Sequence, residues 1–264
     1  MTLKKSLLTM TLTSIAASTA IAAESPLGLT IDVNSSSAYI FRGYNLFQEE
    51  KQSDQNGMIA PSLSWSIGDT GLSVTYFSAY QLNGDNIEAG IDGGVGHEQD
   101  LNVTQSISLN DKTTLSMGIW AYTYPSASKS VSGTSNPTYL EPTIGVSYDT
   151  VVTLGANIAY FRGLQEEIKD YSYTYLNTSV AKSLPLTKTV SFESALSVGY
   201  KYFDNQDVNV DKEYDSLLTL ATPISYGNNG YIKPQIGVAW TNIDDTDTSD
   251  ELAYYVSVNV GATI

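Results

Sequence analysis

Charged and aromatic residues recur along the chain at positions where they could line a water-filled passage and select ions. Rings of charged side chains determine which ions enter a pore. The same charges could instead pair with one another and solvate a polar interior, and this simpler reading stays open beside the first. The candidate channel-lining residues are Asp32, Arg42, Glu141, Glu193, Lys201, Asp215, Lys233, Tyr122, Tyr173 and Tyr175.

Other chemistries find less support in the sequence. The chain has one histidine, His97, in a segment that we expect to be the second outer loop, and a Ser/His/Asp site would depend on it. No serine or acid stands out as its partner. The acidic run 243–251 lacks the glycine and glutamate spacing of an EF-hand, and no helix follows the glycine-rich run 89–96. We therefore expect no enzyme activity, no metal and no cofactor.

A two-residue alternation along the whole chain would position the candidate residues. Residues 252–264 place an apolar side chain at every even position, with Ser257 and Asn259 between them. Because a strand sends alternate side chains to opposite faces, each such segment has one apolar and one polar face. Each segment is close to the ~9–11 residues that a tilted membrane strand needs. The segments are 29–43, 57–67, 71–82, 98–109, 113–124, 138–148, 151–161, 171–183, 189–202, 214–222, 231–241 and 252–264.

The connections between these twelve segments alternate between short turns and long loops. Short turns typical of periplasmic connections follow the even-numbered segments, and longer loops follow the odd-numbered ones. This pattern predicts an all-β fold: a transmembrane antiparallel up-and-down β-barrel of about 12 strands with short periplasmic turns and longer acidic extracellular loops. A secreted β-sandwich is the alternative. The few large hydrophobes on the polar faces and the aromatic residues near segment ends favour the barrel.

The N-terminus has the layout of a secretory signal. Lys4 and Lys5 precede an uncharged stretch that ends in small residues, so we assign residues 1–23 to the signal peptide and 24–264 to the barrel. The whole chain carries a net charge of −15. Without the two lysines, 11 basic residues face 28 acidic ones, a net charge of about −17, which argues against nucleic acid as a partner. We expect export through the periplasm to the outer membrane of a Gram-negative bacterium.

Arg42 lies at the end of the first predicted segment, in the stretch AYIFRGYNLFQEE at 38–50. Arg42 is in phase with Asp32, so we expect it to face the lumen, with Tyr39 and Phe41 facing lipid in an outer aromatic girdle. An outward Arg would cost about 2–4 kcal/mol at the membrane midplane. In the near copy AYFRGLQEE at 159–167, the alternation predicts that Arg162 points outward at the rim.

The motif YIFRG at 39–43, followed by PSLSW at 61–65, resembles the first strands of the TorF-type family of outer-membrane porins. The resemblance in motif covers about the first 70 residues. It departs from the commoner pattern at Tyr44 and Asn45, where that pattern has Ser-Gln. The resemblance implies a passive channel and transfers no catalytic residues.

Two functions remain open at this stage. The first is a narrow porin-like channel for passive diffusion of small hydrophilic solutes, with a preference for cations, because the six long loops hold 18 acidic and 5 basic residues. The alternative is a non-conducting structural barrel whose acidic loops contact lipopolysaccharide or another cell surface. The expected partners are outer-membrane lipid, lipopolysaccharide and small hydrophilic solutes. The sequence does not indicate whether a loop enters the lumen, nor the oligomeric state.

Overall fold

A computed structural model describes residues 27–47, 54–82, 97–125, 136–204, 213–242 and 252–264. The predicted signal peptide, the glycine-rich run 89–96 and the acidic run 243–251 lie outside the described residues, as do most residues of the predicted acidic loops. All contacts given below are between these described residues.

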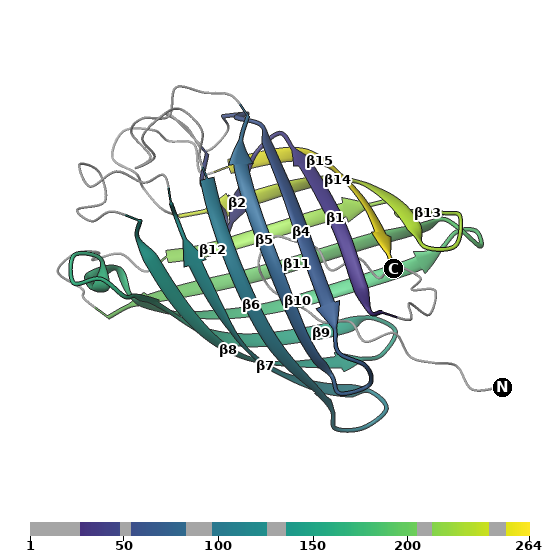
Figure 1. Cartoon of the computed structure of the whole chain (residues 1–264), viewed down its shortest axis with the longest axis horizontal. Helices are drawn as coiled ribbons and strands as arrows, with labels where there is room; N and C mark the ends of the chain where they lie inside the picture. The colour runs from purple at the N-terminus through teal and green to yellow at the C-terminus, as the bar shows by residue number, and fades with distance from the viewer. Residues whose placement is uncertain (1–26, 48–53, 83–96, 126–135, 205–212, 243–251) are drawn as a thin grey trace.

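Twelve long antiparallel strands form a closed barrel, as the alternation predicted (Figure 1). Each strand pairs with the long strands before and after it in the chain, and β1 pairs with β15 to close the ring. They are β1 (Leu29–Ser36), β4 (Met58–Ser66), β5 (Leu72–Gln81), β6 (His97–Ser108), β7 (Thr113–Thr123), β8 (Thr138–Asp149), β9 (Thr153–Gly163), β10 (Tyr173–Pro185), β11 (Ser191–Phe203), β12 (Glu213–Ala221), β14 (Gly230–Thr241) and β15 (Leu252–Thr263).

The two ends of the barrel differ. Tight turns join β4 to β5, β6 to β7 and β8 to β9 at one end, which we call the turn end. The C-terminus lies there too, and Ile264 N–H donates to the Leu29 carbonyl across 2.7 Å. The ends of β5, β7, β9 and β11 that precede the longer connections lie at the opposite end, the loop end (Figure 1). The predicted sorting of turns and loops is therefore confirmed.

The outer surface of the barrel is apolar. Along β15, exposed and buried residues alternate to the end of the strand, with Val256 60% and Tyr254 56% exposed. Ile236 of β14 is 53% exposed beside them. An apolar surface of this extent would be strongly unfavourable in water, whereas it matches the hydrocarbon of a bilayer. Among the described residues, no helix is long and apolar enough to cross a membrane.

Three shorter strands and one helical turn complete the described structure. β2 (Ile40–Phe41) and β3 (Tyr44–Asn45) form a separate two-stranded sheet. β13 (Ile224–Tyr226) pairs with the first residues of β14 in the longer connection at the turn end. The 3-10 turn η1 (Lys169–Tyr171) lies between β9 and β10.

The prediction of one continuous strand over 29–43 is wrong. β1 ends at Ser36, whose Oγ donates to the Ala38 carbonyl across 2.7 Å. The chain then turns into the barrel, so Tyr39 is buried and Phe41 is partly buried inside it, and neither faces lipid. Arg42 and Gly43 both have positive φ, at 50° and 79°. A two-residue hairpin turn of this kind requires positive φ at both positions, and alternation alone does not distinguish such a hairpin from the end of a strand.

Candidate functional site in the barrel lumen

Residues 38–47 cross the lumen near the loop end, and we call this segment the lumen hairpin. On one side, Tyr39 and Phe47 pack in a buried cluster with Phe77 and Ala79 of β5. The rings of Tyr39 and Phe47 meet edge to face with centroids 5.1 Å apart. This cluster anchors both ends of the hairpin to β4 and β5.

The hairpin also touches the strands on the other sides of the barrel. Ile40 packs in a cluster with Ala239 of β14 and Tyr255 of β15. Phe41 contacts the opposite wall, where its ring centroid lies 6.1 Å from that of Tyr122 on β7. The lumen hairpin therefore bridges walls that are far apart around the barrel.

Gly43, at the tip of the hairpin, lies against the wall formed by β12 and β14. A Cβ atom built on Gly43 would lie 2.5 Å from the Cβ of Asp215 and 2.9 Å from the Trp240 carbonyl oxygen. Distances this short are not tolerated between a real Cβ and its neighbours. The close approach and the positive φ together require glycine at this position.

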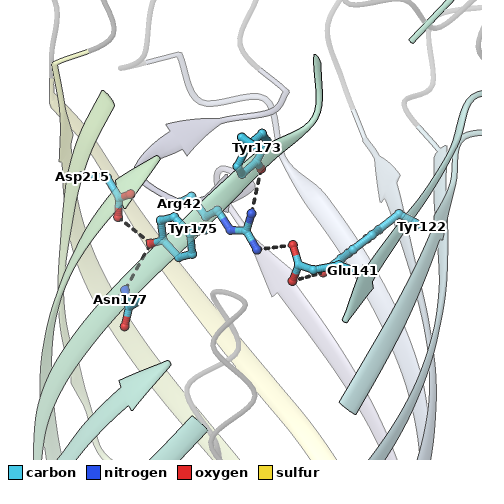
Figure 2. A network of polar contacts seen from close by, with 7 residues as sticks. All are labelled: Arg42, Tyr122, Glu141, Tyr173, Tyr175, Asn177 and Asp215. Atoms are coloured by element: carbon cyan, nitrogen blue, oxygen red, sulfur yellow. Dashed lines mark hydrogen bonds and ion pairs between the residues drawn. The ribbon is translucent and has the colours of Figure 1, made fainter. Parts of the chain in front are cut away.

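The Arg42 guanidinium is fully enclosed in the lumen (Figure 2). Its Nη1 donates to the Tyr173 hydroxyl across 2.7 Å, and its Nη2 forms an ion pair with the Glu141 carboxylate. The Tyr122 hydroxyl donates to the other Glu141 oxygen across 3.3 Å. Breaking a buried ion pair of this kind typically costs about 3–5 kcal/mol, because the remaining charge is left uncompensated. The ion pair with Glu141 therefore holds the hairpin to β8, and the hydrogen bond to Tyr173 holds it to β10.

Aromatic rings surround the same guanidinium. Its Cζ lies 4.2 Å from the ring centroid of Tyr175, 5.3 Å from that of Tyr173 and 5.8 Å from that of Phe161. Phe41 of the hairpin adds a fourth ring at 4.7 Å. Each distance is within the ~6 Å over which a ring attracts a cation. We call Glu141, Phe161, Tyr173 and Tyr175 together the cation cage; all four belong to barrel strands.

Three further polar contacts extend this network toward β11 and β12. The Tyr175 hydroxyl donates to Asp215 Oδ1 across 3.0 Å and accepts from Asn177 Nδ2 across 3.1 Å (Figure 2). Lys201 pairs with Glu213 across 2.8 Å. A Cβ on Gly199 would lie 2.1 Å from the Tyr175 hydroxyl, so this glycine makes room for the tyrosine.

Glu98 and Asp100 add carboxyl groups to the same part of the lumen. Both are buried on β6, and Asp100 lies opposite Tyr122 in the register between β6 and β7. The Tyr124 hydroxyl donates to Glu98 Oε1 across 3.2 Å. Glu98 Oε2 and Asp100 Oδ1 have no hydrogen-bond partner among the described residues. Most buried polar atoms are hydrogen-bonded, so these atoms leave acceptor capacity in the lumen.

The half of the lumen toward the turn end is built differently. Its ionic contacts are the pair of Lys233 with Glu193, at 2.7 Å, and the hydrogen bond from the Tyr231 hydroxyl to the Asp32 carboxylate. Most other inward positions there carry small polar side chains or glycine. They include Ser64, Thr75, Thr104, Ser116, Gly145, Asn157, Ser179 and Ser197.

The structure thus divides the predicted site residues into two groups. Those gathered in the loop-end half are Arg42, Tyr122, Glu141, Tyr173, Tyr175 and Asp215, with Lys201 beside them. Those in the turn-end half are Asp32, Glu193 and Lys233. Arg42 reaches the lumen from a hairpin rather than from a strand, which corrects the predicted placement. Arg162 is exposed and outward-facing, as predicted.

The sequence interpretation missed several lumen residues: Glu98, Asp100, Phe161, Phe203 and Glu213. The alternation contains the signal for most of them. Glu98 and Asp100 share the parity of Asn102, which faces inward, and Phe161 shares that of Asn157. Glu213 lies one residue before the predicted start of its strand.

His97 is the first residue of β6 and not a loop residue, which corrects its predicted place. Its ring stacks on Tyr80 with centroids 4.5 Å apart, and its Nε2 lies 3.3 Å from Ser78 Oγ. The Ser78 hydroxyl also donates to the Glu98 carbonyl across 3.0 Å, and Gln99 Nε2 meets the same histidine nitrogen at 3.1 Å. In a hydrolase triad the serine and the third group bind opposite ring nitrogens, so this contact does not have that arrangement. The expectation that the protein is not an enzyme stays a prediction.

No family model and no curated protein matches this chain. Solved structures of outer-membrane barrels do match it. KdgM porin is 10% identical, with a TM-score of 0.54 over 89% of this chain and 99% of that chain. NanC porin is 13% identical, with a TM-score of 0.50 over 89% and 98%. An outer membrane channel from Pseudomonas putida F1 is 9% identical, with a TM-score of 0.53 over 90% and 96%.

These similarities show the fold. The described chain has the closed barrel and the apolar outer face of a porin-like outer-membrane protein, and the predicted fold class and location agree with them. These similarities do not confirm the finer resemblance to the TorF-type family, which stays a prediction.

Proposed function

We propose that the protein is an outer-membrane channel for passive diffusion of small hydrophilic solutes, restricted at its loop end by the lumen hairpin. The observation that carries this proposal is the contrast within the closed barrel. A lumen with small polar side chains toward the turn end meets a zone that the hairpin crosses, docked by two apolar clusters and by the Arg42–Glu141 ion pair. Small inward side chains leave part of the lumen unfilled by the wall, which a path for solutes requires.

The charges of the lumen support a preference for cations. The described inward-facing acidic residues outnumber the basic ones: Asp32, Glu98, Asp100, Glu141, Glu193, Glu213 and Asp215 against Arg42, Lys201 and Lys233. A surplus of one sign in a passage of low dielectric raises the local concentration of ions of the opposite sign. The channel is therefore proposed to admit cations more readily than anions of equal size.

The same charges bear on the choice of solute. One solved structure is a KdgM porin in complex with disordered oligogalacturonate. A chain of uronic acid units is anionic, and a lumen with surplus carboxylates would repel it. We therefore do not extend that ligand to this chain, and we propose small neutral and cationic solutes instead.

Swelling of proteoliposomes in a graded series of sugars and amino acids tests the proposal. We expect slow swelling for the wild type with small solutes only, and a reversal potential in a salt gradient that indicates cation preference. The Arg42→Ala variant should admit larger members of the series.

The hairpin across the lumen also fits a non-conducting barrel that contacts lipopolysaccharide through its loops. Failure of every solute to enter, in the wild type and in Arg42→Ala, would refute the channel and favour the non-conducting barrel.

A further inference from the structure

We infer that the cation cage is a binding site for guanidinium-type organic cations, and that Arg42 of the lumen hairpin occupies it as an internal ligand. This inference names a solute class for the proposed channel and so rests on the proposed function. Its first basis is the composition of the cage: one carboxylate, one phenol oxygen and three rings, all on β8, β9 and β10, surround a single planar cation. A charged acceptor combined with aromatic faces is a recurrent means of binding organic cations.

The pattern of hydrogen bonds shows which part of the cation the cage binds. The two terminal nitrogens of Arg42 carry the polar contacts, Nη1 with Tyr173 and Nη2 with Glu141. The Nε atom, which bears the link to the backbone, has no hydrogen-bond partner among the described residues. The cage therefore recognises the terminal amidinium group and not the tether. A free alkylguanidinium presents the same group, whereas a primary ammonium is a compact point charge without the planar face that stacks on rings.

The position of Arg42 in the chain also allows its guanidinium to leave the cage and be replaced by another cation. Arg42 belongs to a two-residue turn of a short hairpin and not to the barrel wall, while the cage residues are fixed by strand pairing (Figure 2). The chain can therefore withdraw Arg42 without dismantling the site. Only Phe41 among the four nearby rings would leave with it.

Electrostatics near the cage favour a cation when Arg42 has left. Asp215 accepts from Tyr175 through Oδ1, while its Oδ2 has no hydrogen-bond partner among the described residues. Asp100 lies across β7 from Glu141, opposite Tyr122. An external guanidinium would thus compete with Arg42 for the cage and release the lumen hairpin, so that the solute itself opens its path.

Binding of ethylguanidinium to the purified Arg42→Ala barrel tests this inference, with ethylurea as a neutral probe of nearly the same shape. Isothermal titration should show binding of ethylguanidinium at least tenfold tighter than of ethylurea, and at least tenfold tighter than to the Arg42→Ala/Glu141→Gln variant. Circular dichroism checks that both barrels are folded. Equal affinity for the charged and neutral probes, or for the two variants, overturns the assignment.

If Arg42→Ala does not fold, thiol labelling of a barrel that retains Arg42 provides a second test of the inference. The chain has no cysteine, so Leu46→Cys is a unique reporter on the lumen hairpin. Ethylguanidinium should accelerate thiol labelling at this position at least fivefold, and ethylurea should not. Equal labelling with both probes contradicts the inference. Binding without solute passage in liposomes would refute the proposed channel and leave the cage assigned, whereas passage without binding would refute only the cage.

Discussion

The same strands enclose both halves of the lumen, but the two halves differ in the side chains that they contain. Toward the loop end, an inserted hairpin, bulky rings and a buried Arg42–Glu141 pair occupy much of the lumen. Toward the turn end, the wall provides mostly small side chains, and its Lys233–Glu193 pair joins two strands of the barrel itself. The first pair connects the inserted lumen hairpin to the wall, whereas the second joins two strands of the wall. Two ion pairs of similar burial therefore have different consequences when they are broken.

Glu141→Gln should have the largest effect on the lumen hairpin. The substitution leaves the Arg42 guanidinium buried without its counter-charge, at a cost of about 3–5 kcal/mol. We expect thiol labelling of a Leu46→Cys reporter to rise about 100-fold or more. Glu193→Gln is the matched control, because it breaks the pair with Lys233 at the other end of the lumen. Similar acceleration by both substitutions would show that the comparison between the two halves is wrong.

Gly43→Ala should undock the hairpin through backbone strain and steric overlap, and not through the loss of an ion pair. Its positive φ of 79° costs an L-residue about 1–2 kcal/mol, and the new Cβ would overlap Asp215. Labelling of the same reporter should rise by roughly tenfold or more. Gly68→Ala is the control, since Gly68 also has positive φ but has nothing within 4 Å of its built Cβ. An unchanged labelling rate in Gly43→Ala would mean that the tip of the hairpin is not docked against β12.

Tyr173→Phe should have a smaller effect because it removes one acceptor of the Arg42 guanidinium and keeps the ring. Loss of a hydrogen bond to a charged group costs about 1.5 kcal/mol, which corresponds to about a tenfold increase in labelling. Tyr231→Phe removes the hydroxyl that donates to Asp32 in the other half of the lumen and should not change the labelling rate. A labelling rate in Tyr173→Phe no higher than in Tyr231→Phe would show that the Tyr173 hydroxyl does not hold the hairpin.

Replacing Glu193 and Lys233 together by glutamine should have the smallest effect. The double substitution leaves no unpaired buried charge, so the cost of breaking the pair is largely avoided. We expect the labelling rate of the Leu46→Cys reporter to change less than twofold. The melting temperature of the barrel, followed by circular dichroism, reports whether this pair contributes to the wall. A labelling rate like that of Glu141→Gln would show that the two halves are coupled.

The sequence predicts most of this barrel and little of its hairpin. Alternation and turn chemistry give all twelve strands, because each strand must keep one face in lipid and one in the lumen. The same alternation could have placed Glu98 and Phe161 in the lumen. It could not show that the chain turns inward after Ser36, because Tyr39 and Phe41 have the spacing of a lipid-facing strand while they pack against aromatic residues of the lumen. Contacts between residues as distant as Arg42 and Glu141 are set by the closure of the barrel.

Single-channel conductance of Glu141→Gln in planar bilayers tests most directly the claim that the lumen hairpin restricts passage. We expect a conductance several-fold above that of the wild type, with Glu193→Gln/Lys233→Gln close to the wild-type value. Wild-type conductance in a Glu141→Gln barrel whose hairpin is shown by thiol labelling to be undocked would contradict it.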